Sequence, residues 1–259
     1  MRLALWQDQS PIGDQAAAIN RIDQAARAAG CMGAAVLVLP EVYLPGYNHQ
    51  AIRERALPRT AAVLDQIGAI ARAAQCAIVL GYAERDGDAI FNAAMVFGAT
   101  GDAIAHYRKI QLFGPREKAI YSAGSHHAVF EFHGHKAALL ICYDIEFACH
   151  VAALAKQGVT LILVPTANME PFDHVVRHTV ATMAANYGMT IVYANYCGSD
   201  GDLTYVGGSL IAGPHGEILA QAGRGPALLV VNMPDRDPAR LSTQGADYRR
   251  IAVSPGVAP

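Results

Sequence analysis

The strongest constraint on how this chain folds is an order of secondary structure elements that the sequence contains twice. Residues 34–39 and 138–141 are continuous apolar runs, which are typical of strands buried on both faces of a sheet. The first half contains predicted strands at 2–7, 34–39, 77–83, 90–98 and 103–107, and predicted helices at 14–29 and 58–74. The second half contains predicted strands at 136–141, 160–164, 190–195, 208–212, 217–221 and 227–232, and predicted helices at 145–157 and 173–187.

Two halves of this kind predict an α/β fold in which two sheets pack face to face and helices cover the outer faces. We expect a four-layer α-β-β-α sandwich of two internally similar halves. Residues 1–259 are predicted to form a single domain, because no linker or low-complexity segment separates the halves. Gly30 is predicted to end the first helix, and residues 108–124 to form a polar loop. The tail at 234–259, with Tyr248, Arg249 and Arg250, is predicted to be an extension that packs on a partner subunit.

Composition excludes several classes of protein. The 259 residues carry a net charge of −2 with a pI near 6.5, so neither nucleic acid nor an acidic membrane surface is indicated as a partner. No run reaches the roughly 18 apolar residues of a membrane span, and the N-terminal apolar run is too short for a signal peptide. Five cysteines without a Cys-x-x-Cys pair indicate reduced thiols. We therefore predict a cytoplasmic globular protein.

Three chemically active side chains come directly after predicted strands. Glu41 follows the strand at 34–39, Lys109 follows 103–107 and Cys142 follows 136–141. A thiol needs a base to become a nucleophile, and a carboxylate in an apolar pocket has a raised pKa suited to that task. An ammonium group beside them can stabilise an oxyanion, so the three would form a complete set for acyl transfer. Each residue also has an inert interpretation, and spacing alone does not show that they converge.

Cys142 lies between a predicted buried strand and a predicted helix. Turns of this kind hold reactive groups in α/β proteins, because the strand fixes the backbone while the loop exposes the side chain. A helix N-terminus would also favour the thiolate over the thiol. Taken alone, however, a free cysteine is more often a small buried hydrophobic residue than a catalyst.

Other catalytic and metal-binding signatures are incomplete in this sequence. Ser209 lies in a Gly-Gly-Ser-Leu-Ile segment that lacks the final glycine of a nucleophile elbow, and no phosphate-binding or dinucleotide-binding glycine motif is present. His174 and His178 have the spacing of a zinc helix, but Val175 occupies the position of the catalytic glutamate. Four more histidines cluster near a predicted strand edge: His126, His127, His133 and His135. We expect solvated side chains there and predict no metal.

Three segments around the strand-end residues form a set of motifs. Residues 39–47 read Leu-Pro-Glu-Val-Tyr-Leu-Pro-Gly-Tyr, and residues 107–113 read Tyr-Arg-Lys-Ile-Gln-Leu-Phe. Residues 140–144 read Leu-Ile-Cys-Tyr-Asp. In this order they resemble the glutamate, lysine and nucleophile motifs of the nitrilase superfamily of carbon–nitrogen hydrolases. The resemblance spans nearly the whole chain, and the family's αββα sandwich agrees with the duplicated order of elements.

The resemblance implies a role for each matching position. Cys142 would be the nucleophile, and Glu41 the general base that later protonates the leaving ammonia. Lys109 would hold the oxyanion together with the backbone N–H of Tyr143. The family also has a second glutamate a few residues after the lysine, and Glu117 occupies that place, where it would position the substrate and the hydrolytic water. The implied reaction passes through a thioester and needs no metal or organic cofactor.

The residues after the nucleophile depart from a common pattern of the family. Many members have Arg-Phe-Pro-Glu where this chain has Glu-Phe-Ala-Cys at 146–149. If Glu146 faces the pocket, its carboxylate would disfavour anionic amides on Coulomb grounds. We therefore predict a small neutral or cationic aliphatic amide as substrate. Tyr143, Glu146 and Asn168, the last in a loop at 167–173, are the candidate substrate-binding residues.

Two other interpretations of the site stay open. A nitrilase or an N-carbamoyl amide hydrolase would use the same three residues, although Tyr143 and Asp144 favour an amidase, since nitrilases tend to carry Cys-Trp-Glu at the nucleophile. A non-catalytic binding protein on this fold is a further alternative, and the joint presence of all four candidate catalytic residues argues against it. Because members of the family are usually dimers, the resemblance implies a homodimer or a larger homo-oligomer.

Overall fold

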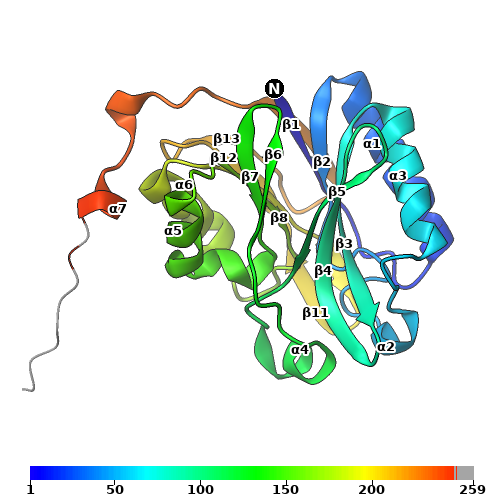
Figure 1. The fold of residues 1–259 in the computed structure, drawn as a ribbon. Helices are drawn as coiled ribbons and strands as arrows, with labels where there is room; N and C mark the ends of the chain where they lie inside the picture. The colour runs from blue at the N-terminus through cyan, green and yellow to red at the C-terminus, as the bar shows by residue number, and fades with distance from the viewer. Residues whose placement is uncertain (248, 250–259) are drawn as a thin grey trace, which may run out of the picture.

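The computed structural model describes residues 1–247 and residue 249. Two six-stranded sheets face each other, and helices cover the outer side of each sheet (Figure 1). The predicted four-layer α-β-β-α sandwich is therefore confirmed.

The first sheet consists of β14 (Ala227–Asn232), β1 (Arg2–Gln7), β2 (Ala34–Val38), β3 (Ala77–Asp86), β4 (Ala89–Phe97) and β5 (Ala103–Arg108), in that spatial order. The second consists of β13 (Ile218–Gln221), β12 (Leu210–Ala212), β9 (Thr190–Ala194), β8 (Leu161–Pro165), β7 (His135–Leu139) and β6 (Ala128–Phe132). A separate hairpin pairs β10 (Cys197–Asp200) with β11 (Leu203–Val206). The helices are α1 (Gln15–Cys31), α2 (Ile52–Arg55), α3 (Ala62–Ala74), α4 (Gly114–Ile120), α5 (Ala148–Lys156), α6 (Val180–Tyr187) and α7 (Gln244–Asp247).

Both sheets have the same internal arrangement. Parallel strands β1-β2-β3 form the centre of one sheet, and β7-β8-β9 form the centre of the other. Each centre has one antiparallel strand on one side and two on the other. β14 stands beside β1 as β6 stands beside β7. Residues 227–232 therefore do not belong to the second sheet, as the sequence order suggested, and 128–132 form a strand that the sequence pattern did not predict.

The carboxyl ends of the strands that carry the candidate residues meet at one end of the sandwich. β5 runs antiparallel to β4, which runs antiparallel to β3, so β5 ends at the same edge as β2 and β3. The backbone N–H of Glu41 donates to the carbonyl of Thr166 at 3.2 Å, which joins the ends of β2 and β8 across the two sheets. Sheet topology thus brings together residues that are far apart in the sequence.

The core follows from the apolar runs. β8 and β9 are buried along their full length, and residues such as Val36, Leu163 and Val192 fill the space between the sheets. A second apolar layer, which includes Ile22 and Ile67, packs α1 and α3 against the first sheet. α5 and α6 cover the second sheet in the same way.

Two helices of the first half differ from their predicted bounds. α1 continues past Gly30, which allows a close helix–helix contact, because a Cβ there would lie 2.1 Å from the carbonyl oxygen of Ala74. The prediction that this glycine ends the helix is wrong. The predicted loop at 108–124 contains α4, whose first residues are Gly114 and Pro115. Its polar sequence concealed a helix that positions Glu117.

Two predicted helices of the second half begin with tighter or wider turns. The helix predicted at 145–157 is a 3₁₀ turn, Cys142–Glu146, followed by α5. The helix predicted at 173–187 begins with a π-helical turn, Val175–Thr179, and continues as α6.

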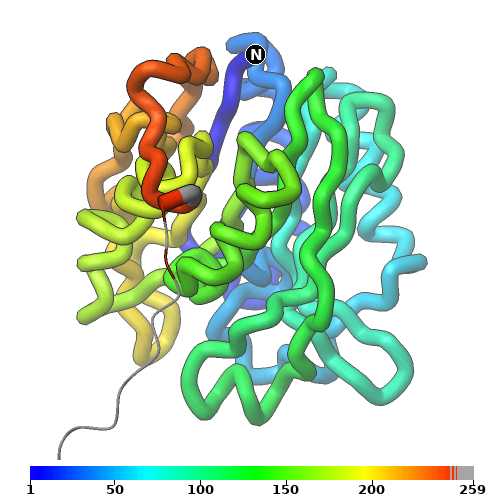
Figure 2. The backbone as a smooth tube through the Cα atoms, turned by 60° about the vertical axis from the view of Figure 1, so that its left-hand side comes forward, coloured from blue at the N-terminus to red at the C-terminus, as the bar shows by residue number. Residues whose placement is uncertain are grey.

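The described part of the tail folds back on its own chain. A 3₁₀ turn, Pro238–Arg240, leads to α7, which lies against α6 (Figure 2). Tyr248 and Arg250 lie outside the described residues, so packing of the tail on a partner subunit stays a prediction. Of the helices that the structure describes, none has both the length and the apolar character needed to cross a membrane.

Candidate active site

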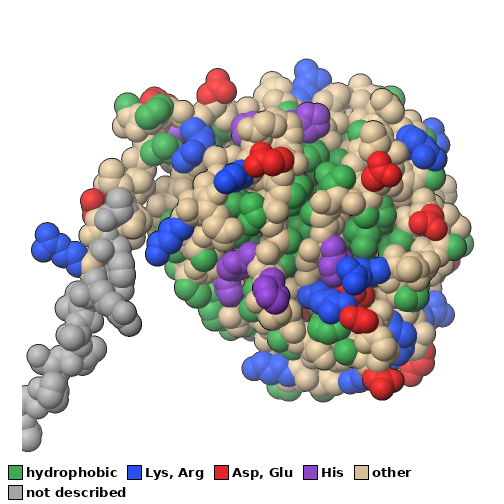
Figure 3. All heavy atoms as spheres, in the orientation of Figure 1, with side chains coloured by type: hydrophobic (Ala, Val, Ile, Leu, Met, Phe, Trp, Pro, Cys, Tyr) green, Lys and Arg blue, Asp and Glu red, His purple; other side chains and the backbone are tan. Residues whose placement is uncertain are grey.

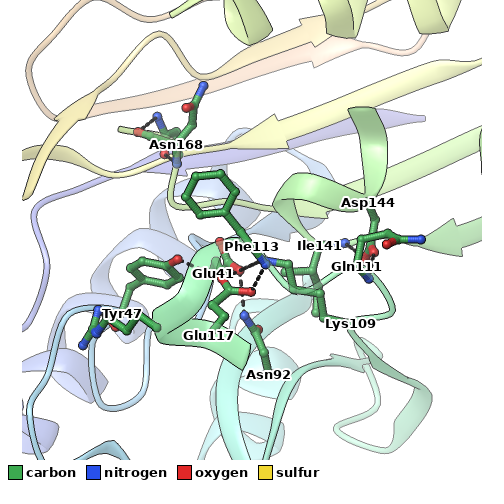
Figure 4. Close-up of polar contacts among 12 residues, drawn as sticks. Glu41, Tyr47, Asn92, Lys109, Gln111, Phe113, Glu117, Ile141, Asp144 and Asn168 are labelled. Atoms are coloured by element: carbon green, nitrogen blue, oxygen red, sulfur yellow. Dashed lines mark hydrogen bonds and ion pairs between the residues drawn. The ribbon is translucent and has the colours of Figure 1, made fainter. Parts of the chain in front are cut away.

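Glu41 lies in the turn after β2, and its side chain is completely buried. Its Oε1 accepts hydrogen bonds from Lys109 Nζ at 2.6 Å and from Asn92 Nδ2 at 2.7 Å (Figure 4). Its Oε2 has no hydrogen-bond partner among the residues described. The turn packs on β3 at Gly81, where a Cβ would lie 2.6 Å from the carbonyl oxygen of Pro40. One carboxylate oxygen is therefore fixed, and the other can accept a proton.

Lys109 follows β5 and holds a buried ammonium group between two carboxylates. Its Nζ lies 2.6 Å from Glu41 Oε1 and 2.8 Å from Glu117 Oε1. Its backbone N–H donates to the carbonyl of Asn92 at 2.8 Å, which fixes the residue against β4. Burial acts to lower the pKa of Lys109, but the charges of Glu117 and Glu41 outweigh it and hold the pKa well above its ordinary value. The group therefore stays a cation.

Glu117 projects from α4 and connects three segments of the chain. Its Oε1 accepts hydrogen bonds from Lys109 Nζ and, at 2.8 Å, from the Tyr47 hydroxyl. Its Oε2 accepts a hydrogen bond from the backbone N–H of Phe113 at 2.8 Å. The carboxylate thus ties the lysine to the end of the glutamate motif (Figure 4).

Cys142 begins the 3₁₀ turn after β7 with a φ of +45°, a conformation that costs a non-glycine residue about 1 kcal/mol or more. The buried carboxylate of Asp144 holds this turn. Its Oδ2 accepts hydrogen bonds from the N–H of Ile141 at 3.0 Å and the hydroxyl of Tyr107 at 2.8 Å. Its Oδ1 accepts one from the N–H of Gln111 at 2.7 Å. Because residues 107 and 111 flank the lysine, Asp144 fixes the cysteine turn against the lysine segment.

The protonation states of the cysteine and the glutamate follow from burial. Burial raises the pKa of the Cys142 thiol well above its ordinary value, the charge of Glu41 raises it further, and Lys109 opposes the rise. Burial also raises the pKa of Glu41 to about 7, against the charge of Lys109 and with that of Glu117. The expectation that a helix N-terminus favours the thiolate is wrong, because a short 3₁₀ turn follows the cysteine and burial beside a carboxylate dominates. Above neutral pH the resting pair is a thiol beside a carboxylate.

Cys142 lies in the wall of a cavity of about 200 Å³. The wall is mostly aromatic and apolar and consists of Tyr47, Phe113, Cys142, Tyr143, Glu146, Ala167, Asn168, Met169, Phe172 and His174. All three residues predicted to bind substrate therefore line the same cavity as the cysteine. Glu146 therefore faces the pocket, which the prediction against anionic amides requires. A cavity of this size admits only a small molecule.

The polar wall residues differ in how they are held. The side-chain nitrogen of Asn168 donates to the carbonyl of Phe172 at 3.0 Å, and its backbone N–H donates to Asn195 Oδ1 at 2.8 Å. Asn168 therefore stabilises its own loop. Glu146 is partly buried, and burial raises the pKa of its carboxyl group, with the charge of His174 opposing the rise.

The histidines do not assemble into a site of their own. His174 lines the cavity, whereas His127 and His150 pair with each other outside it, with 2.9 Å between Nε2 of the first and Nδ1 of the second. Figure 3 shows histidine side chains gathered on the face over β5 to β7. Among the described residues, no group of three or more histidine, cysteine, aspartate or glutamate side chains is arranged to hold a metal ion.

Three residues that organise the site were not predicted from the sequence. Asn92 holds Glu41 from within β4, Tyr47 holds Glu117, and Asp144 holds the cysteine turn. A signal existed for Asn92, because a polar residue inside an apolar strand needs a buried hydrogen-bond partner. Tyr47 and Asp144 lie in the motif segments 39–47 and 140–144. Their hydrogen-bond partners, however, come from other segments and cannot be inferred from the spacing of residues within a motif.

Comparison with known proteins agrees with this geometry. A model of the carbon–nitrogen hydrolase family matches residues 2–240. The chain is 41% identical over 234 residues to "Hydrolase in pqqF 5′ region" of Pseudomonas protegens, covering 89% of this chain and 81% of that protein. It is 32% identical over 260 residues to the (R)-stereoselective amidase of a Pseudomonas species, covering 98% and 93%.

A solved structure is also similar over nearly the whole chain. The NitN amidase from Nesterenkonia sp. AN1 matches with a TM-score of 0.87 and 35% identity over 96% of each chain. The chain therefore belongs to the carbon–nitrogen hydrolase family, and the resemblance to the nitrilase superfamily is confirmed. It is an enzyme that hydrolyses carbon–nitrogen bonds other than peptide bonds.

Proposed function

We propose that this enzyme is an amidase that converts small aliphatic amides into carboxylic acids and ammonia through a thioester on Cys142. The observation that carries the proposal is the buried cluster in which Lys109 bridges Glu41 and Glu117, next to a cysteine in the wall of a small cavity. The cluster contains a base, a permanent cation and a nucleophile, which is what acyl transfer requires.

In the first half-reaction, Glu41 accepts the thiol proton through its free Oε2, and the sulfur of Cys142 attacks the amide carbon. The negative charge that develops on the carbonyl oxygen is stabilised by Lys109 Nζ and the backbone N–H of Tyr143. Glu41 then returns its proton to the departing nitrogen. The carbon–nitrogen bond breaks, ammonia leaves, and the acyl group remains on the sulfur.

In the second half-reaction, Glu41 takes a proton from water and the resulting hydroxide attacks the thioester carbon. The carbon–sulfur bond breaks, the thiol regains its proton, and the carboxylic acid leaves. Glu117 keeps the ammonium of Lys109 in place through a 2.8 Å contact and, by its position beside the cluster, orders the substrate and the water. The adjacent carboxylate also helps to keep the pKa of Glu41 near neutrality, where one group can serve as both base and acid.

Structures of the Nesterenkonia amidase support a small aliphatic acyl group. One is a complex with butyramide, and another shows covalent addition of the acetamide moiety of fluoroacetamide at the active site cysteine. The cavity of about 200 Å³ beside Cys142 supports an acyl group of comparable size.

The charge of Glu146 argues against anionic substrates. Its carboxyl group lines the same cavity as Cys142, and a substrate carboxylate there would be repelled. We propose neutral or cationic amides. Initial rates of ammonia release from butyramide and from 2-oxoglutaramate test this, and a clear preference for 2-oxoglutaramate would remove the argument from charge.

The test of the activity itself is ammonia release from a panel of amides, nitriles and N-carbamoyl amino acids. Cys142→Ala is expected to abolish turnover and leave the unfolding transition unchanged, and mass spectrometry of the native enzyme with amide is expected to show an acyl adduct. Turnover of nitriles or carbamoyl compounds alone would assign a sibling activity. Turnover of nothing would support a binding protein, and turnover by the alanine variant would remove the cysteine from the mechanism.

A further inference from the structure

Glu146 places in the cavity a carboxylate that no described side chain pairs with directly, although the charge of His174 acts on it from a longer distance. It lines the cavity beside Cys142 and is partly buried. Within the described part of the chain, it makes neither a hydrogen bond nor an ion pair, in contrast to Glu41, Glu84, Glu117 and Asp144, which all do. A partly buried carboxylate without a partner is costly, and a ligand that supplies a donor or a positive charge removes that cost.

Aromatic side chains line the same cavity as this carboxylate. The rings of Phe113 and Tyr143 meet edge to face at 5.2 Å, and those of Phe113 and Phe172 do so at 5.4 Å. Tyr143 also meets Phe147 at 4.9 Å. Aromatic faces attract ammonium groups through their quadrupole, and a carboxylate beside them completes a site that is common for amine recognition. Neutral aliphatic chains need the aromatic wall alone, so the carboxylate points to a charged ligand.

The charges around the cavity also favour a positively charged ligand. Lys109 carries one positive charge and pairs with the carboxylates of Glu41 and Glu117, so these three residues together present no net positive charge to a carboxylate elsewhere on the substrate. His174 also lines the cavity, but among the described residues it forms no ion pair with Glu146. A substrate with a positive charge therefore complements the cavity better than a neutral one.

We propose that Glu146 and the aromatic wall form a subsite for a protonated amine, so that the preferred substrates are amides with an ammonium group on a short acyl chain. The proposal rests on the amidase function above and specifies its substrate class. Cys142 and Glu146 begin and end one 3₁₀ turn, which places their Cα atoms about 8 Å apart along the turn. The carbonyl carbon and the amine nitrogen of such a substrate must both lie within a cavity of about 200 Å³, which limits the acyl chain to a few carbons.

The experiment compares 3-aminopropanamide with butyramide at pH 8. The two molecules have the same number of heavy atoms and differ in one terminal group, ammonium against methyl. We expect a kcat/KM ratio of at least about tenfold in favour of the ammonium substrate. In Glu146→Gln the ratio is expected to fall close to one, and in Phe172→Leu it is expected to fall part of the way. Glu131→Gln, an exposed glutamate on β6, is the matched control and should keep the native ratio.

The outcomes separate the subsite from the activity. Equal kcat/KM values for both amides, or a native ratio in Glu146→Gln, would overturn the subsite and leave the amidase function intact. If neither amide turned over, the proposed function would fail instead. Binding of both amides to Cys142→Ala, measured by calorimetry, then still decides, because the subsite predicts tighter binding of 3-aminopropanamide and equal affinities contradict it. Circular dichroism of each variant shows that a changed ratio belongs to a folded enzyme.

Discussion

Asp144 is the residue whose replacement tests how the site is held together. Its three hydrogen bonds link the cysteine turn to both sides of the lysine segment, at 3.0, 2.8 and 2.7 Å. Asp144→Asn keeps the shape of the side chain but replaces one acceptor oxygen by an NH₂ group. If the amide oxygen takes the position that accepts two bonds, the new NH₂ group faces the N–H of Gln111, and two donors oppose each other.

The magnitude follows from the hydrogen bonds that this substitution breaks. A hydrogen bond to a charged group contributes about 1.5–3 kcal/mol, and a buried donor without a partner costs about 1–3 kcal/mol. Burial raises the pKa of Asp144, so a neutral amide at this position avoids part of the cost of burying a charge. We therefore expect the free energy of unfolding, measured in urea, to fall by about 2–4 kcal/mol. A shift of about 1 Å between sulfur and ammonium lowers rates by about 100-fold, and we expect kcat for butyramide to fall by at least that much.

Controls distinguish positioning from general destabilisation. Tyr107→Phe removes one of the three bonds and should lie between native and Asp144→Asn in both measurements. Asp65→Asn changes an exposed aspartate on α3 and should change neither. An Asp144→Asn enzyme with native kcat and native stability would contradict this prediction. The three hydrogen bonds would then only compensate for the free energy that it costs to bury the Asp144 carboxylate.

Three further outcomes follow from the same geometry. Because Glu41 must be ionised to accept the thiol proton and burial raises its pKa to about 7, kcat/KM should rise with pH through that value by about tenfold per unit on the acid side, and a flat profile from pH 5 to 8 contradicts this. Gly81→Ala places a Cβ 2.6 Å from one backbone atom of the glutamate turn and 2.7 Å from another, so the free energy of unfolding should fall by about 1–3 kcal/mol and kcat should fall as well. Gly223→Ala is the control and should behave as the native enzyme, because a Cβ there meets nothing within 4 Å. Tyr47→Phe removes the hydroxyl donor of Glu117 and should lower the melting temperature by an amount that corresponds to about 1 kcal/mol, and an unchanged melting temperature would show that water replaces the hydroxyl.

Local sequence pattern predicted the parts of the fold that local physics determines. The predicted strands at 34–39 and 136–141 became β2 and β7, with Glu41 and Cys142 in the turns that follow. The direction of the strands brings the catalytic turns together, because parallel strands of a sheet end at the same edge. The pattern did not show that β14 pairs with β1, since the two strands come from opposite ends of the chain and no local rule selects between two sheets.

The charge state of the cysteine shows where local reasoning stops. A strand-to-helix turn favours a thiolate when only the turn is considered. The structure adds burial and the carboxylate of Glu41, which comes from a distant part of the sequence, and both raise the pKa of the thiol. Interactions between distant segments therefore decide the pKa, and they depend on topology rather than on motif spacing.

The same interactions assign the proton chemistry among the three residues. Lys109 cannot act as a base, because two carboxylates within 2.8 Å hold its proton and keep its pKa well above the ordinary value. Glu41 is the remaining acceptor, and within the described part of the chain only its Oε2 is free, since Oε1 already receives the lysine and the amide of Asn92. A thiol with a raised pKa is a poor nucleophile until its proton moves, and it becomes a strong one once it does. Proton transfer to Glu41 is thus most favourable when a substrate carbonyl lies next to Lys109 and the negative charge can pass from sulfur to an oxygen that the ammonium stabilises.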